Sequence, residues 1–160
     1  MKKLLLPAFI FLISCNKNDS KPVTNPLGVV NYSIQDSDIK ITDTTAGSKA
    51  IWVLTQISKG YGLQAYNSVA GGEVHDMISI FIASTELKNG YKYAATGNIL
   101  RNSEDNAAAL NLPETYLSIT ITDQSNNKLS GTFTGHLKNL STNEYFDVSG
   151  DFKNVALIGE

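Results

Sequence analysis

Apolar and polar residues alternate along the last third of the chain, and this alternation limits the possible fold more than any other feature. Within three segments between Leu117 and Phe152, apolar side chains recur at every second position, with serine, threonine and charged residues between them. Successive side chains of a strand point to opposite faces, so the pattern predicts strands with one buried and one exposed face. We therefore predict a three-stranded antiparallel meander over residues 116–122, 128–138 and 144–157, with a first loop at 123–127.

The predicted register of this meander matches apolar residues with apolar residues or with glycines. Centring the second turn on residues 140–141 places Phe133 opposite Val148 and Gly131 opposite Gly150. A slip of one residue would turn the apolar set toward solvent, so the two faces are strongly specified. Aromatic side chains on the same face are expected to cover both glycines.

Shorter alternating segments precede the meander. Further strands are predicted at residues 29–34, 39–42, 50–57, 62–67, 77–84 and 91–95, with turn-forming residues between them. Residues 103–110 predict a helix instead, because Ser103 suits a helix cap, two acidic residues follow it, and three alanines come next. About nine strands have to bury their apolar faces on one another, which predicts an all-β domain. We favour an antiparallel sandwich of about 8–9 strands, because the strand lengths are uneven, and keep a closed or partly open barrel as the alternative.

The N-terminus has the composition of an export signal. Lys2 and Lys3 precede an apolar run over residues 4–13, which ends at Ser14 and at Cys15, the only cysteine of the chain. A helix that spans a bilayer needs about 20 apolar residues, so this run is too short for a permanent membrane span. Its length and flanking residues are typical of a secretory signal peptide.

The segment Leu12-Ile13-Ser14-Cys15 resembles the lipobox of bacterial lipoproteins. The resemblance implies that diacylglycerol is attached to the Cys15 sulfur, that the chain is cut before Cys15, and that a fatty acid such as palmitate acylates the new N-terminus. We therefore expect a signal peptide at residues 1–14, a lipidated cysteine and polar tether at 15–26, and one β domain at 27–160. The expected location is the cell envelope, anchored to a membrane by lipid on Cys15, with the outer membrane favoured.

Three segments of the meander, at residues 117–123, 128–133 and 147–155, carry a second resemblance. They are similar to the C-terminal signature of small, uncharacterised Gram-negative lipoproteins with a domain of unknown function. The run from Leu129 to Phe133 is its most specific part, and the stretch from Asp147 to Val155 completes it. The resemblance covers about residues 78–156. It implies an all-β domain on a lipid anchor and brings no activity.

Charge argues against nucleic acid as a partner. The chain has 13 basic and 15 acidic residues, and removing Lys2 and Lys3 with the signal peptide leaves 11 basic residues against 15 acidic ones. Nucleic-acid binding requires a concentrated basic surface, which this balance does not favour. A single cysteine also rules out a disulfide within the chain.

Residues that could carry chemistry are few. His75 and His136 are the only histidines, and the sequence has no Gly-x-Ser-x-Gly nucleophile motif. His75 is followed by Asp76, but adjacent residues of a strand are expected to point to opposite faces. We therefore predict no catalytic residues and no cofactor. A hydrolase acting on envelope polymers or glycans is the alternative.

Two clusters of residues contain side chains of the types that bind metal ions. Glu73, His75 and Asp76 lie close together, but a zinc site would require a further histidine or cysteine at ligand spacing. A second group, Asp36, Asp38 and Asp43, flanks a turn without the pattern of a calcium loop. No metal is predicted, and metal binding by the loop around His75 stays open.

Aromatic side chains near loops and strand ends are the remaining candidates for a binding surface. With their polar neighbours on the exposed face of the meander, the candidates are Tyr61, Tyr66, Tyr91, Tyr93, His136, Tyr145 and Asp147. Exposed tyrosines can stack on sugar rings or anchor protein partners, and otherwise would seal the ends of the domain. An apolar calyx lined by Phe133 and Leu117 is another site to consider. The expected function is a non-enzymatic binding or structural module whose partner is a glycan, a small ligand or an envelope protein.

Overall fold

The computed structural model describes residues 27–34, 37–43, 48–55, 59–68, 74–101, 105–109 and 113–159. The described residues contain ten strands: β1 (Val29–Ile34), β2 (Ser37–Thr42), β3 (Lys49–Thr55), β4 (Gly60–Ser68), β5 (Val74–Ile82), β6 (Lys92–Arg101), β7 (Asp105–Ala109), β8 (Tyr116–Ser125), β9 (Lys128–Asn139) and β10 (Tyr145–Gly159). No helix in these ranges is long and apolar enough to cross a membrane. The predicted all-β class is confirmed. The predicted signal peptide, Cys15 and the tether lie outside the described residues.

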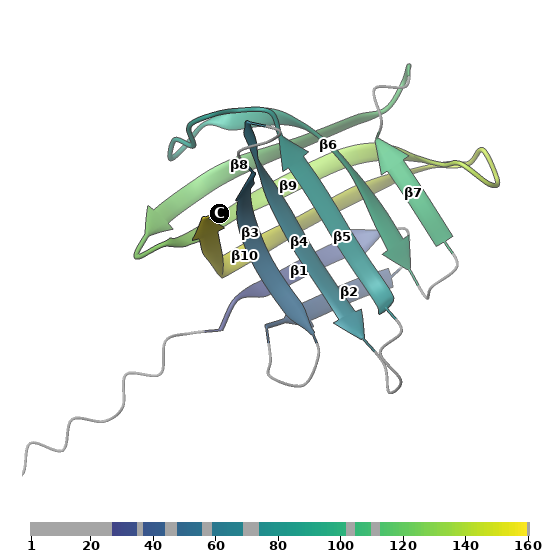
Figure 1. Cartoon of the computed structure of the whole chain (residues 1–160). Helices are drawn as coiled ribbons and strands as arrows, with labels where there is room; N and C mark the ends of the chain where they lie inside the picture. Colours follow the sequence, from purple (N-terminus) through teal and green to yellow (C-terminus); the bar gives the residue numbers. More distant parts are fainter. Residues whose placement is uncertain are drawn as a thin grey trace, which may run out of the picture.

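The strands pair in a closed circuit. The order β10-β3-β4-β5-β6-β8-β9 returns to β10, because β9 and β10 also pair with each other. The β10–β3 pairing is parallel and the other pairings are antiparallel. Figure 1 shows the strands wrapping around one interior. This closed sheet is the barrel that was the alternative prediction, and the described strands do not show the favoured sandwich of two separate sheets.

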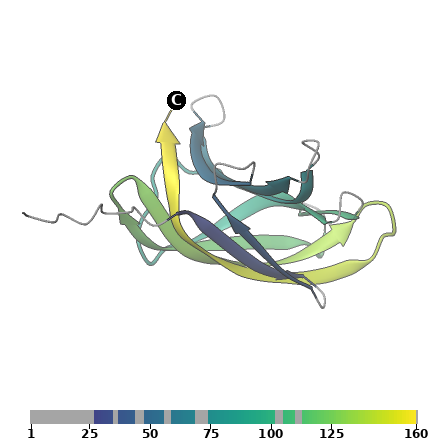
Figure 2. The same cartoon turned by 90° about the horizontal axis from the view of Figure 1, so that it is seen from below.

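A bend in β10 makes this closure possible. Its first part pairs with β1 and its last residues pair with β3, so both strands share one edge of β10. Between these parts the register with β9 shifts at Phe152/Val155. There Asn154 has a φ of 53°, and its N–H donates to Ser130 Oγ at 3.1 Å. Such a bulge bends a strand, and Figure 2 shows β10 turning from one side of the barrel to the other.

The predicted helix at residues 103–110 is wrong where the structure describes it, because Asp105–Ala109 forms β7. This strand pairs with β6 and with β9, where Ala107 lies opposite Asn139. It therefore fills the space between β6 and β9 next to the start of β8. Local helix preference is weak, and two neighbouring strands with open edges override it.

The faces of the C-terminal meander are as predicted, but the register of both strand pairs differs by two residues. Gly131 pairs with Phe152, and Phe133 pairs with Gly150. The first turn is a tight one at Asn126 and Asn127, both with positive φ, and not the loop expected at 123–127. A shift of two residues keeps each side chain on its face. The alternation of apolar and polar residues therefore cannot reveal such a shift.

The second turn explains the shift between β9 and β10. The Asn139 N–H donates to the Glu144 carbonyl at 2.8 Å, so the turn is centred later than residues 140–141. Asn139 Oδ1 also accepts hydrogen bonds from the backbone N–H groups of Ser141 and Thr142, at 2.8 and 3.2 Å. A buried asparagine at the end of β9 thus fixes this turn.

The barrel interior is filled by inward-facing apolar side chains. Ile119, Phe133 and Val148 from three neighbouring strands are all buried, as the alternation predicts. The predicted cover for the glycines is also confirmed, because the rings of Phe152 and Phe133 lie where Cβ atoms on Gly131 and Gly150 would be. These aromatic rings fill the space that the two glycines leave.

Candidate binding surface

Three outward-facing side chains lie side by side across the last three strands. Tyr116 of β8 is paired with His136 of β9, which is paired with Asp147 of β10. Each is flanked by a buried residue of the barrel wall, such as Leu117 or Val148. Alternation therefore turns all three side chains to the outer face. His136 and Asp147 were predicted for this face, whereas Tyr116 was not predicted as part of the surface.

Two tyrosine rings flank the His136 imidazole. The imidazole and the Tyr145 ring have centroids 5.4 Å apart and planes only 8° from parallel. The Tyr116 ring lies on the other side, at 6.3 Å and 21°. Tyr116 is 56% exposed and Tyr145 is 39% exposed. We call Tyr116, His136 and Tyr145 the aromatic row; its three near-parallel rings are stacked, and both tyrosines are exposed in part.

Charged groups border the aromatic row. His136 Nδ1 lies 2.8 Å from Asp147 Oδ1, and the Lys138 Nζ lies 5.3 Å from the centre of the Tyr145 ring. When Nδ1 carries the proton and donates to Asp147, the Nε2 atom is left as the second hydrogen-bonding atom of the ring. The surface thus combines ring faces with a carboxylate, an imidazole nitrogen and an ammonium group. These groups suit a ligand that has both flat apolar faces and hydroxyl groups.

A groove lies on β5 and β6. It has a volume of about 410 Å³ and is lined by Phe81, Ala83, Ala94, Ala95 and Thr96, which we call the side groove. The pairing of β6 with β8 ends at Ala95 and Leu117, and from Gly97 onward β6 pairs with β7. The groove could not be predicted from the sequence, because its lining comes from β5, the segment after it, and β6, which are brought together only by strand pairing.

A second His–carboxylate contact lies on β5. His75 Nδ1 is 2.9 Å from Asp76 Oδ2, although adjacent strand residues were expected to point to opposite faces. The expectation is wrong because Val74 pairs with Ser68 while Asp76 pairs with Asn67, which leaves His75 as an extra residue in a bulge. Bulges redirect side chains in this way. Glu73 lies outside the described residues, which contain no group of three potential metal-ligating side chains.

Tyr32 faces the barrel interior near Asp76. Burial raises the pKa of the Tyr32 hydroxyl well above its ordinary value, the Asp76 carboxylate raises it further, and Arg101 acts in the opposite direction. The hydroxyl oxygen is buried and has no hydrogen-bond partner in the described part of the chain. It therefore stays protonated and carries an unmet hydrogen-bonding capacity.

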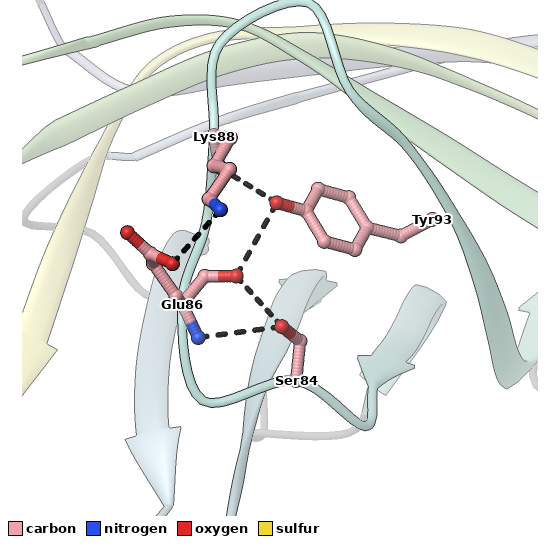
Figure 3. A network of polar contacts seen from close by, with 4 residues as sticks. All are labelled: Ser84, Glu86, Lys88 and Tyr93. Carbon is pink, nitrogen blue, oxygen red and sulfur yellow. Dashed lines mark hydrogen bonds and ion pairs between the residues drawn. The ribbon is translucent and has the colours of Figure 1, made fainter.

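Tyr93 belongs to the interior, although the sequence suggested it for the surface. Its ring is buried, and its hydroxyl accepts a hydrogen bond from the Lys88 N–H at 2.6 Å and donates to the Glu86 carbonyl at 3.2 Å (Figure 3). Ser84 Oγ donates to the same carbonyl at 2.7 Å. Tyr93 therefore holds the segment between β5 and β6 in place.

The other predicted aromatic residues do not join the aromatic row. Tyr61 is half-buried and packs against the core, and Tyr66 is half-buried on β4. Tyr91 is 56% exposed, but its ring lies 4.7 Å from that of Tyr93. Phe133 and Leu117, suggested as the lining of a calyx, are buried in the core. Of the candidate residues, the structure brings together His136, Tyr145 and Asp147.

Comparisons with known proteins add no family to this geometry. No protein-family model, no curated protein and no solved structure matches the chain. The resemblance to envelope lipoproteins thus stays a prediction from the sequence. Any assignment of function has to come from the residues themselves.

Proposed function

We propose that this protein is a lipid-anchored module of the bacterial cell envelope that binds an envelope component through the aromatic row and catalyses no reaction. Two features support the proposal: the lipobox-like segment ending at Cys15 and the exposed rings of β8, β9 and β10. The anchor keeps the domain near the membrane, while the barrel holds the rings in a fixed arrangement.

The aromatic row is the observation that carries the proposal. Large exposed aromatic side chains often mark binding sites, because they supply contact area at a low cost in side-chain entropy. Here they are positioned by directly paired strands of the barrel wall, so little further ordering is needed on binding. A pre-formed surface of this kind is well suited to recognition.

The tether sets how far the domain stands from the membrane. Between Cys15 and Pro26 the sequence is polar and carries little to bury. Ten such residues reach at most about 33 Å when extended. The barrel would then lie just beyond the lipid headgroups, where envelope polymers and proteins are within reach.

A hydrolase remains the alternative function. Its support is the pair His136–Asp147, because a carboxylate on Nδ1 orients imidazoles that act as general bases. Such a mechanism also requires a nucleophile or an activated water, and the sequence contains no nucleophile elbow. The pair alone supports a binding role at least as well, because it fixes the orientation of the imidazole between two rings.

A co-sedimentation experiment tests the proposed function. The mature protein should sediment with insoluble envelope material, and the double variant Tyr116→Ala/Tyr145→Ala should lose most of this binding, because both outer rings of the row are removed. The matched control is Tyr91→Ala, since Tyr91 has the same exposed fraction as Tyr116 but lies outside the row. Equal sedimentation of the wild type and the double variant would refute a binding role for the aromatic row.

A further inference from the structure

We infer that the outer face of β3, β4, β5 and β6 rests on the lipid bilayer that holds the Cys15 anchor, and that the aromatic row therefore points away from the membrane. This inference rests on the proposed function and deepens it by naming the side of the barrel that the membrane covers. Three features carry it: the apolar character of this face, its charges, and the place where the chain enters the barrel.

The outward side chains of β3 to β6 are largely apolar. Trp52, Leu63 and Ile80 are buried in the barrel, so their neighbours within each strand point outward. We call this outer face the apolar wall, and its large outward side chains are the half-buried residues Ile51, Val53, Tyr66, Met77, Phe81 and Leu100. Figure 1 shows β3, β4 and β5 side by side in it.

Strand pairing makes the apolar wall continuous. Tyr66 of β4 pairs with Met77 of β5, which pairs with Leu100 of β6. Val53 and Phe81 both pair with the same glycine of β4, and the side groove opens beside Phe81. Neighbouring strands lie about 4.8 Å apart, so the four strands span roughly 14 Å. An apolar face of this kind on the outside of a domain marks a contact with a membrane or a partner.

The charges on the apolar wall favour a membrane over a protein partner. Lys49 is exposed at the start of β3 and Lys59 is exposed directly before β4. Because β3 and β4 are antiparallel, these lysines lie at opposite ends of the wall. No described outward position of β3 to β6 is acidic, and Asp76 of β5 is buried. Lysines that border an apolar face are attracted to anionic lipid headgroups.

The chain enters the barrel at the edge of the apolar wall. A Cβ atom on Gly28, just before β1, would lie 3.2 Å from the Val155 Cα atom and 3.3 Å from the Ala50 carbonyl oxygen of β3. The polar segment between Cys15 and Leu27 therefore joins the domain beside β3, the first strand of the wall. The lipid would supply the attachment, and the wall would set the orientation.

The aromatic row lies on the opposite side of the barrel. In the closed circuit at least two strands separate β4 from β9 in either direction. Asp147 and Asp151 of β10 face outward on the side of β9, where they pair with His136 and Thr132. A barrel that rests on its apolar wall would thus keep its acidic residues away from the headgroups and present the aromatic row to the envelope beyond the membrane.

Fluorescence quenching in vesicles tests which wall touches lipid. The mature lipidated protein carries one introduced cysteine with a fluorophore, either Gln64→Cys on the apolar wall or Thr132→Cys on the opposite side, and both positions are exposed. Cys15 is the only native cysteine and its sulfur would carry the lipid, so the label attaches at the introduced position. The vesicles contain equal parts of phosphatidylethanolamine and phosphatidylglycerol with a spin-labelled lipid as the quencher. We expect quenching to be several-fold stronger at position 64 than at position 132.

Reversing the charge of the two lysines tests the role of the headgroups. Lys49→Glu/Lys59→Glu should remove most of the quenching at position 64, because four negative charge units are added beside an anionic surface. The matched control is Lys40→Glu/Lys153→Glu, which changes the net charge equally at exposed lysines outside the apolar wall and should retain the quenching. Thermal unfolding confirms that both double variants are folded.

The outcomes distinguish this inference from the proposed function. Vesicle-bound protein with equal quenching at positions 64 and 132 would overturn the inference, while sedimentation that depends on the aromatic row would leave the proposed function standing. Equal quenching in the two lysine variants would likewise overturn it. Shielding of the label at position 64 that rises with protein concentration, without quenching by lipid, would show that a second copy covers the wall instead. Failure of the wild type to bind vesicles would overturn the proposed anchor and this inference with it.

Discussion

Tyr32 and Trp52 show what single residues contribute to the barrel interior. The side chain of Trp52 is fully buried against Phe152, with ring centroids 5.4 Å apart. The nitrogen of Trp52 and the hydroxyl of Tyr32 are buried without a hydrogen-bond partner in the described residues. Alternation within a strand indicates which residues point inward. Alternation gives no information on the hydrogen-bond partners of buried polar atoms, because these partners come from strands far away in the sequence.

Replacing Tyr32 by phenylalanine should stabilise the domain. The variant removes a buried hydroxyl without a partner and keeps the ring, so the free energy of unfolding should rise by about 1 kcal/mol at neutral pH. Chemical denaturation of the two proteins measures the difference. A loss of more than about 1 kcal/mol would show that the hydroxyl makes a stabilising bond.

The same variant should change the response to alkali. The pKa of Tyr32 is raised in the folded state, while an unfolded tyrosine ionises near pH 10. Below about pH 10 the hydroxyl is protonated in both states, so ionisation does not reduce the stability of the folded protein. As the pH rises further toward the folded pKa, the unfolded state ionises first and stability is lost. The advantage of Tyr32→Phe over the wild type should therefore grow above pH 10. A constant difference would contradict the burial of this hydroxyl.

At the scale of elements, the sequence predicted most strands and the faces of the meander, but not the pairing. The turn at Asn126 and Asn127 and the turn held by Asn139 each move the register by two residues, which leaves residues 116–121 and 145–152 on their predicted faces. The strand β7 was missed because alanine-rich residues favour a helix locally, and its partners β6 and β9 cannot be seen in its own sequence. The aromatic row was therefore only partly predictable.

Gly131 tests the packing between β8, β9 and β10. A Cβ atom at this position would collide with the Thr120 carbonyl oxygen of β8 and would lie 2.5 Å from the Phe152 ring of β10. Gly131→Val should therefore destabilise the domain by about 1–3 kcal/mol, because overpacking has to push these strands apart. Thermal or urea unfolding measures the loss.

Gly159→Val is the control for that variant. A Cβ atom on Gly159 meets nothing within 4 Å, although Gly159 also lies in a strand and pairs with Leu54. Its stability should stay within about 0.5 kcal/mol of the wild type. Similar losses in the two variants would mean that valine is unfavourable for reasons other than the crowding at Gly131.

At the scale of the whole molecule, the proposed role depends on where the barrel is held. Cys15→Ala should release the protein from membranes, because the predicted lipid is attached through its sulfur and stable anchoring requires more than one acyl chain. Membrane fractionation followed by a carbonate wash measures the release, with Ser20→Ala in the tether as a control that keeps the anchor. Continued membrane association of the Cys15→Ala variant would refute lipid anchoring.

The bend of β10 determines when the chain can finish folding. This strand comes last in the sequence, yet β1, β3 and β9 all pair with it. Contacts between residues so far apart in the chain make folding slow, because a long loop has to close before they form. The barrel therefore cannot close until β10 has been synthesised. A protein that crosses a membrane as an extended chain would benefit from this delay, since premature closure would block its passage.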